Sequence, residues 1–328
     1  MTWLPSIDRT LRAAMLFSEI QPPERLFHHK VDRDMNARAT HRQRLRLSRG
    51  TELSFITAGE PTRPALLLLH GTPHSAQYFR HVAPELAHVA YVIAPDLPGF
   101  GESDVLPTAS FPAYADAIAE LLDRLHVGSR YIYLHDWGTP VGLHLAMQAP
   151  ERVSGLIIQN GNAHRTGLSP QWDPVLAYSS QPTPENEAKA TAHLNFEGTR
   201  GTYTTGVPAD LVAGLSPERW EEDWRVMQLP GRFEKERALI ADYGRYIARF
   251  DAIADYLKRH QPPALMIWGR HDPFFALAET LSWMEDLPRM EAHILDAGHL
   301  LLETHAPTAA ALMLNFLSRN QAETDRTR

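Results

Sequence analysis

The sequence predicts an α/β fold in which a mostly parallel sheet is flanked by helices and interrupted by a helical insert. Short runs of consecutive apolar residues, typical of strands buried on both faces, alternate with runs whose apolar residues recur at helical spacing. The alternation stops near residue 161, where proline, tryptophan and polar residues become frequent, and it resumes after residue 250. We therefore expect a core made of residues 41–160 and 251–320, with a helical insert at 161–250.

The first part of the core begins with a predicted hairpin. Residues 44–48 and 53–58 flank the turn at Arg49-Gly50, which is typical of two antiparallel strands. Residues 65–70 form a continuous apolar run and predict a buried parallel strand. The elements that follow are expected on the same grounds: strands at 91–94, 131–135 and 153–159, and helices at 111–126 and 139–148.

The second part of the core repeats the alternation after the insert. We expect strands at 264–269 and 291–295 and helices at 277–285 and 308–317. Residues 1–40 precede the core as an N-terminal extension, with helical spacing of apolar residues at 7–20. The last residues, 321–328, are polar, and we expect them to form a disordered tail.

The composition excludes several classes of protein. The 328 residues carry a net charge of −7 at pH 7, which offers no basic surface to nucleic acid or anionic lipid. The chain has no cysteine, so disulfides, thiolate catalysis and cysteine-based zinc sites are excluded. No apolar run approaches the roughly 18–20 residues that a membrane-spanning helix needs. We expect a cytoplasmic protein without nucleic-acid or membrane partners.

An aspartate stands where the predicted central strand ends and a helix begins. Residues 131–140, Tyr-Ile-Tyr-Leu-His-Asp-Trp-Gly-Thr-Pro, have the context of a nucleophile elbow, in which the turn commonly holds serine. Here the position belongs to Asp136, and the start of a helix favours its ionised form. A carboxylate can displace a leaving group from an alkyl carbon and form an alkyl ester, which water then hydrolyses.

Two more reactive side chains follow predicted strands, in the order Asp136, Asp272, His299. Hydrolases with a nucleophile elbow have this order of nucleophile, acid and histidine, and sites in open α/β sheets form at the carboxyl ends of strands. His299 is suited to act as the general base that activates water. Asp272 would hold the histidine in the correct tautomer and stabilise its charged form.

The turn His70-Gly71-Thr72-Pro73 follows another buried strand and adds to the predicted site. Its glycine allows the backbone to turn sharply. We expect the N–H groups of Thr72 and Trp137 to form an oxyanion hole for the tetrahedral intermediate of ester hydrolysis. Losing one such donor typically raises the barrier by about 2.7–4 kcal/mol.

Each of these features alone has an ordinary explanation. An aspartate at a helix start is usually a cap, and most of the 17 histidines are expected in the core or in solvent. The joint occurrence of three such residues in this order favours a hydrolase. The chain has no G-x-S-x-G and no H-E-x-x-H, so we predict neither a serine nucleophile nor a metal site. A non-catalytic binding or signalling protein on the same fold is the alternative from another class.

Together these segments resemble the α/β-hydrolase superfamily, in its branch with an aspartate nucleophile, which contains epoxide hydrolases and haloalkane dehalogenases. The resemblance covers about residues 50 to 318 and implies an α/β-hydrolase fold, an insert that acts as a cap domain over the pocket, and no cofactor. The matching motifs are H-G-x-P at 70–73, D-L-P-G-F-G-E-S-D at 96–104, H-D-W-G at 135–138, W-G-x-x-D-P at 268–273, and A-G-H at 297–299 with a later glutamate at 303.

The two activities of this branch differ in the leaving group. An epoxide oxygen needs a proton, which the family supplies from two cap tyrosines. The resemblance assigns these positions to Tyr178 and Tyr243, and Tyr203 and Tyr246 are the alternatives.

A halide needs N–H donors instead. In the family, the tryptophan after the nucleophile supplies one donor, here Trp137, and Trp172 is the candidate for the second. Thr72 departs from both groups, because one dehalogenase subfamily has asparagine there and epoxide hydrolases usually have an aromatic residue.

The favoured hypothesis is hydrolysis of an epoxide to a vicinal diol through an ester on Asp136, and haloalkane dehalogenation is the alternative. The expected partners are water and a small, largely apolar electrophile. The sequence leaves the oligomeric state open, with residues 1–40 and the insert as candidate contact surfaces of a homo-oligomer.

Overall fold

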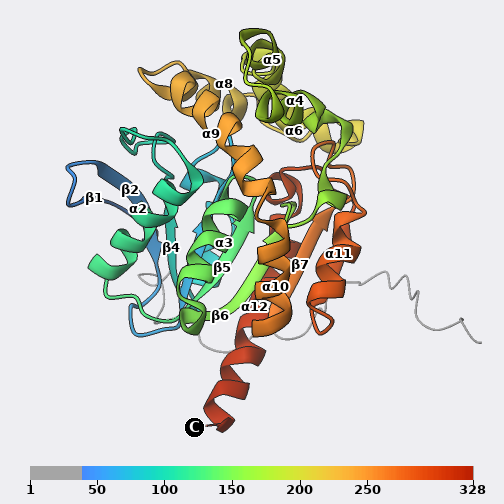
Figure 1. Cartoon of the computed structure of the whole chain (residues 1–328). Coiled ribbons are helices and arrows are strands. Elements are labelled where there is room, and N and C mark those ends of the chain that lie inside the picture. Colours follow the sequence, from blue (N-terminus) through green and yellow to red (C-terminus); the bar gives the residue numbers. More distant parts are fainter. Residues whose placement is uncertain (1–38, 328) are drawn as a thin grey trace, which may run out of the picture. The chain divides into compact units, whose positions relative to one another are not determined.

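The computed structural model describes residues 39–327, with side chains described as far as residue 322. Eight strands form one sheet in the order β1-β2-β4-β3-β5-β6-β7-β8 (Figure 1). β1 and β2 form an antiparallel hairpin, β2 pairs with β4 antiparallel, and every later pair is parallel. The bounds are β1 His41–Arg46, β2 Glu52–Ala58, β3 Ala65–Leu69, β4 Tyr91–Pro95, β5 Arg130–His135, β6 Val153–Gln159, β7 Ala264–Gly269 and β8 Glu291–Leu295.

The central strands are apolar because both faces of the sheet are covered. In β3, Leu67 and Leu69 pack into the hydrophobic cluster on one face, whereas Leu66 and Leu68 pack into the cluster on the other. This is the alternation expected of successive side chains in a strand. The edge strand β1 carries charged, mostly exposed side chains instead, which discourages pairing with another sheet.

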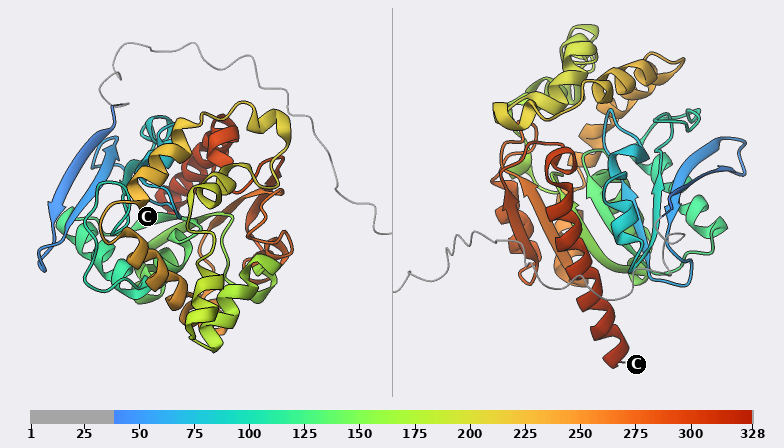
Figure 2. Two further views of the ribbon diagram at one scale, coloured as in Figure 1. Left: turned by 90° about the horizontal axis from the view of Figure 1, so that it is seen from above. Right: turned by 180° about the vertical axis from the view of Figure 1, so that it is seen from behind.

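Helices cover the two faces of the sheet in separate groups. The clusters assign α2 (Phe111–Arg124), α3 (Gly138–Gln148), α10 (Phe250–His260) and α11 (Glu279–Asp286) to one face. They assign α1 (Ala83–Leu86) and α12 (Leu301–Thr327) to the other, and Figure 2 shows α12 in front when the molecule is seen from behind. The apolar spacing that predicted the helix at 111–126 forms the buried face of α2, and the Ser110 side chain caps it by accepting from the N–H of Ala113.

Between β6 and α10 the described chain forms helices and turns, and Figure 1 shows the helices of this segment above one end of the sheet. Proline and polar caps start many of them; for example, Thr183 and Asn195 accept hydrogen bonds from N–H groups of the first turn. The helices are α4 Asp173–Ser180, α5 Pro184–Ala190, α6 Phe196–Thr204, α7 Ala209–Val212, α8 Glu218–Met227 and α9 Arg232–Ile247.

The disordered tail expected at 321–328 is a wrong prediction, because α12 continues to Thr327; the alanine, glutamine and glutamate in this stretch are good helix formers. The helix also begins before residue 308, at Leu301, and it kinks at His305, two residues before Pro307. The helix expected at 7–20 lies outside the described residues.

Candidate active site

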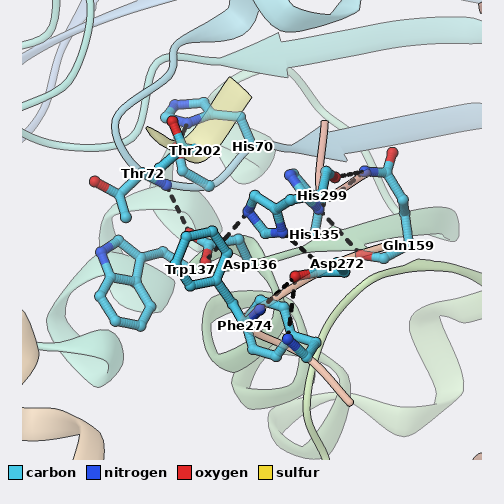
Figure 3. Close-up of polar contacts among 12 residues, drawn as sticks. His70, Thr72, His135, Asp136, Trp137, Gln159, Thr202, Asp272, Phe274 and His299 are labelled. Carbon is cyan, nitrogen blue, oxygen red and sulfur yellow. Dashed lines mark hydrogen bonds and ion pairs between the residues drawn. The ribbon is translucent and has the colours of Figure 1, made fainter. Parts of the chain in front are cut away.

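Asp136 occupies the sharp turn between β5 and α3. Its φ angle is +46°, in the left-handed region that residues with a side chain seldom adopt. Such strain persists only where the surrounding structure enforces it, and it is concentrated at functional sites. The side chain is 7% exposed and points toward the end of the sheet where His299 and Asp272 lie (Figure 3).

Two backbone N–H groups hold the carboxylate of Asp136. The N–H of Thr72 donates to Oδ1 over 2.7 Å, and the N–H of Trp137 also donates to the carboxylate. Burial raises the pKa of Asp136 above its ordinary value, whereas nearby His299 and the two N–H donors favour the anion and limit the rise. The two N–H groups predicted as an oxyanion hole thus both donate to the carboxylate of the predicted nucleophile, that of Thr72 to Oδ1.

The turn that carries Thr72 approaches Asp136 so closely that only glycine fits beside it. A Cβ on Gly71 would lie 2.2 Å from Cβ of Asp136. His70 does not line the cavity: its Nδ1 donates to the carbonyl of Gly71, and its Nε2 accepts the N–H of Leu97. Burial lowers the pKa of His70 to about 4, so the ring is neutral and can accept that N–H. His70 therefore positions the turn and does not contact a substrate.

His299 and Asp272 complete the predicted triad. Nε2 of His299 lies 3.8 Å from Oδ2 of Asp136, and Nδ1 lies 2.8 Å from Oδ2 of Asp272. The other oxygen of Asp272 accepts the N–H groups of Phe274 and Phe275. Burial opposes charge on His299, but Asp272 outweighs it and raises the pKa of the imidazole above its ordinary value. The ring is oriented to take a proton at Nε2, on the side of Asp136.

A cavity of about 320 Å³ opens onto these residues. Its size is in the range of sites for small molecules, and its walls are largely apolar. The core supplies the reactive side chains, and the insert supplies most of the opposite wall. The lining residues are Thr72, Asp136, Trp137, Pro170, Gln171, Trp172, Pro174, Val175, Lys189, Ala190, Ala192, His193, Thr202, Ile240, Phe274 and His299.

The two predicted tyrosines are placed differently. Tyr243, on α9, is 1% exposed and stacks face to face on Trp172 at 4.2 Å, just behind the cavity wall. Its hydroxyl accepts the side-chain N–H of Asn162 over 3.2 Å, which leaves its own proton free to be donated. Tyr178 is not brought to the site, because α4 turns it toward a separate depression beside Gly244.

The other residues considered for the leaving group already have partners. Trp172 lines the cavity, but its indole N–H donates to the carbonyl of Phe274 over 2.8 Å. Tyr203 donates to Asp223, and Tyr246 donates to the carbonyl of Asn162.

Glu236, on α9, belongs to this site and was not identified from the sequence. Oε1 accepts the hydroxyl of Thr72 over 2.8 Å and the ammonium of Lys235 over 2.8 Å, and Oε2 accepts the indole N–H of Trp137 over 3.1 Å. Adjacent Lys and Glu in a polar helix usually indicate an exposed face. One pattern in the sequence could have indicated that Glu236 is buried: it precedes Leu239 and Ile240 at helical spacing, on the apolar face of α9.

Gln159 and His135 support His299 from behind, and neither was predicted to do so. The side-chain N–H of Gln159 donates to the carbonyl of His299 over 3.0 Å. The ring of His135 lies 4.7 Å from the ring of His299, and burial lowers the pKa of His135 well below its ordinary value. A neutral ring at this position adds no positive charge to compete with protonation of His299. Figure 3 shows the three side chains together.

In residues 39–327 no helix is long and apolar enough to cross a membrane. Within the same part of the chain, no group of three or more histidine, aspartate or glutamate side chains is placed to hold a metal ion.

Known proteins resemble this chain over most of its length. Residues 64–306 match the family model described as alpha/beta hydrolase fold. An uncharacterized hydrolase of Saccharomyces cerevisiae is 31% identical over 292 residues, which cover 84% of this chain and 97% of that protein. A haloalkane dehalogenase of Mycolicibacterium paratuberculosis is 30% identical over 282 residues, which cover 82% and 88% of the two chains.

A solved structure shows the same fold. Epoxide hydrolase CorEH without ligand superposes with a TM-score of 0.70 at 24% sequence identity, covering 86% of this chain and 99% of that one. The fold predicted from the alternating strands and helices is confirmed. The chain belongs to the α/β-hydrolase family and is an enzyme of the hydrolase class.

Proposed function

We propose that this hydrolase opens a small apolar epoxide to a vicinal diol through a covalent alkyl ester on Asp136. The observation that carries the proposal is the arrangement around that carboxylate. Asp136 sits in a strained elbow with its carboxylate held by two backbone N–H groups, that of Thr72 on Oδ1, and Oδ2 lies 3.8 Å from Nε2 of His299. A buried carboxylate placed in this way is poised to attack carbon, and the histidine beside it is poised to activate water.

In the first step, Oδ2 of Asp136 forms a bond to one epoxide carbon, and the bond from that carbon to the epoxide oxygen breaks. The released oxygen takes a proton and remains attached to the product as a hydroxyl. We assign the proton to Tyr243, because burial holds its pKa well above the ordinary value and keeps the hydroxyl protonated. Its acceptance of the Asn162 N–H directs its own proton elsewhere.

In the second step, His299 takes a proton from water, and the water oxygen attacks Cγ of the ester. Negative charge develops on Oδ1, where the N–H of Thr72 stabilises it, and the N–H of Trp137 donates to the same carboxyl group. Asp272 stabilises the imidazolium that forms. Collapse of the intermediate breaks the bond between Cγ and the alkoxy oxygen, which takes the proton back from His299. The second proton of the water is left on the Asp136 carboxyl, and it passes to the phenolate oxygen of Tyr243. The diol leaves, with Asp136 restored as the carboxylate and Tyr243 as the phenol.

Haloalkane dehalogenation is the second candidate, and the 30% identity with a haloalkane dehalogenase favours it. It would use the same ester and the same hydrolysis. The departing halide would need free N–H donors near Asp136, however, and the indole N–H groups of Trp137 and Trp172 donate to Glu236 and Phe274. We therefore favour a leaving group that stays attached to the product and takes a proton.

The test is the mass of the intact protein after His299→Gln has been incubated with a mixture of epoxides and haloalkanes. Without its base the variant should accumulate the ester, and the double variant Asp136→Ala/His299→Gln should gain no mass. An adduct with the whole mass of an epoxide supports the proposal. An adduct equal to an alkyl group without its halogen supports the second candidate, and no adduct on His299→Gln would sink both.

A further inference from the structure

We propose that Glu236 is a specificity-determining residue, a fixed protein anion that occupies the side-chain donors next to Asp136 and so excludes leaving groups that depart as free anions. The substrate preference in this inference rests on the proposed function. The occupied anion position itself does not, because it can be measured without any turnover.

Two residues hold two carboxylates at once. The backbone N–H groups of Thr72 and Trp137 donate to Asp136. The side-chain hydroxyl of Thr72 and the indole N–H of Trp137 donate to Glu236, over 2.8 and 3.1 Å. The second carboxylate therefore takes the two side-chain donors that the neighbours of the nucleophile offer. A halide released at Asp136 would have to compete with it for both.

The charge of Glu236 is built into the protein interior with its own counterion. Glu236 and Lys235 are each 1% exposed in their side chains, and the ammonium lies 2.8 Å from Oε1. The same ammonium lies 3.1 Å from the centre of the Phe100 ring, a favourable contact for a cation. Removing one member of such a buried pair is strongly unfavourable, so the carboxylate is held in place.

A free anion next to Glu236 would meet like charge at short range, which is strongly unfavourable in a desolvated site. The negative charge of Glu236 also contributes to raising the pKa of Asp136, which is evidence that the two carboxylates influence each other. An epoxide avoids the conflict, because its oxygen is protonated and never leaves as an anion. The pair of carboxylates thus selects against halides by charge, without restricting the size of the substrate.

The experiment measures bromide binding by tryptophan fluorescence at constant ionic strength, in wild type, Glu236→Gln and Glu234→Gln. Glu234 lies on the same helix with an exposed side chain, so its variant removes the same charge outside the site. In Glu236→Gln the amide keeps one acceptor oxygen in place of two, so bromide gains at least one freed donor and becomes the counterion of Lys235. We expect saturable quenching in this variant only, and its loss when Trp137→Phe is added.

The second readout is the ratio of kcat/KM for a bromoalkane to kcat/KM for an epoxide of similar size. We expect Glu236→Gln to raise this ratio about tenfold or more, equivalent to about 1.4 kcal/mol. If Glu236→Gln does not fold, Lys235→Met/Glu236→Leu replaces the ion pair by apolar side chains of similar size and still frees both donors, so it carries the same two measurements.

Saturable bromide binding in wild type as tight as in Glu236→Gln would overturn the inference. So would folded Glu236→Gln and double variants that both lack saturable binding. Failure of the proposed function gives a different result: wild type would turn over no epoxide, while the bromide titrations would still report on Glu236.

Discussion

Gly71→Ala should nearly abolish turnover by displacing the turn that holds the nucleophile. The new Cβ would lie 2.2 Å from Cβ and 2.4 Å from Oδ1 of Asp136, whereas ordinary contacts begin at 3.4 Å. The turn must therefore retreat by about 1 Å, and a displacement of this size near the reacting atoms can cost about 10²-fold in rate. It also breaks the 2.7 Å hydrogen bond from the N–H of Thr72. Loss of one such donor lowers kcat by about 10²–10³.

The assay is kcat with the electrophile that forms the ester on His299→Gln, together with the thermal midpoint of unfolding. Gly128→Ala is the matched control, because the added Cβ would meet nothing within 4 Å. We expect Gly128→Ala to keep wild-type activity. The reasoning is refuted if folded Gly71→Ala keeps more than about a tenth of wild-type kcat, because a lost donor alone should cost more than that.

Two further predictions concern proton transfer. Tyr243→Phe should lower epoxide turnover by about 10²–10⁴-fold, the usual contribution of a general acid. Tyr178→Phe is the control and should leave turnover unchanged, because Tyr178 lines a separate depression. Equal effects of the two variants on kcat/KM would remove Tyr243 from the mechanism. Hydrolysis of the ester needs the neutral form of His299, which is present above the pKa of the imidazole and is lost as the pH falls through it. A raised pKa therefore moves this loss to higher pH. Asp272 raises the pKa of His299 above the ordinary 6.5. As the pH is lowered, the rate of ester decay in single turnovers should therefore reach half of its maximum at a pH above 6.5. A midpoint below 6.5 contradicts the assignment.

The sequence predicted the sheet and the position of Asp136 because both depend on local patterns. Runs of buried apolar residues define β3, β5 and β6, and the nucleophile, acid and histidine follow strands whose carboxyl ends meet at one edge of the sheet. The insert was harder to interpret, because the direction of each side chain depends on how short helices pack. Tyr178 and Tyr243 looked equivalent in sequence, yet only Tyr243 packs directly behind the cavity wall, on Trp172. That the N–H of Trp172 points at Phe274 follows from packing alone.

The unusual residue in the H-G-x-P motif is explained by a residue far away in the sequence. Thr72 has neither the asparagine nor the aromatic side chain that the resemblance implies at this position, and its hydroxyl donates to Glu236, 164 residues later. A carboxylate as buried as that of Glu236 needs donors, and the half-buried hydroxyl of Thr72 supplies one of them, beside Trp137 and Lys235. Sequence patterns within one segment cannot reveal such a pair. Together the two residues join α9 to the turn at residues 70–73, and under our proposal the choice of leaving group depends on this contact between the insert and the core.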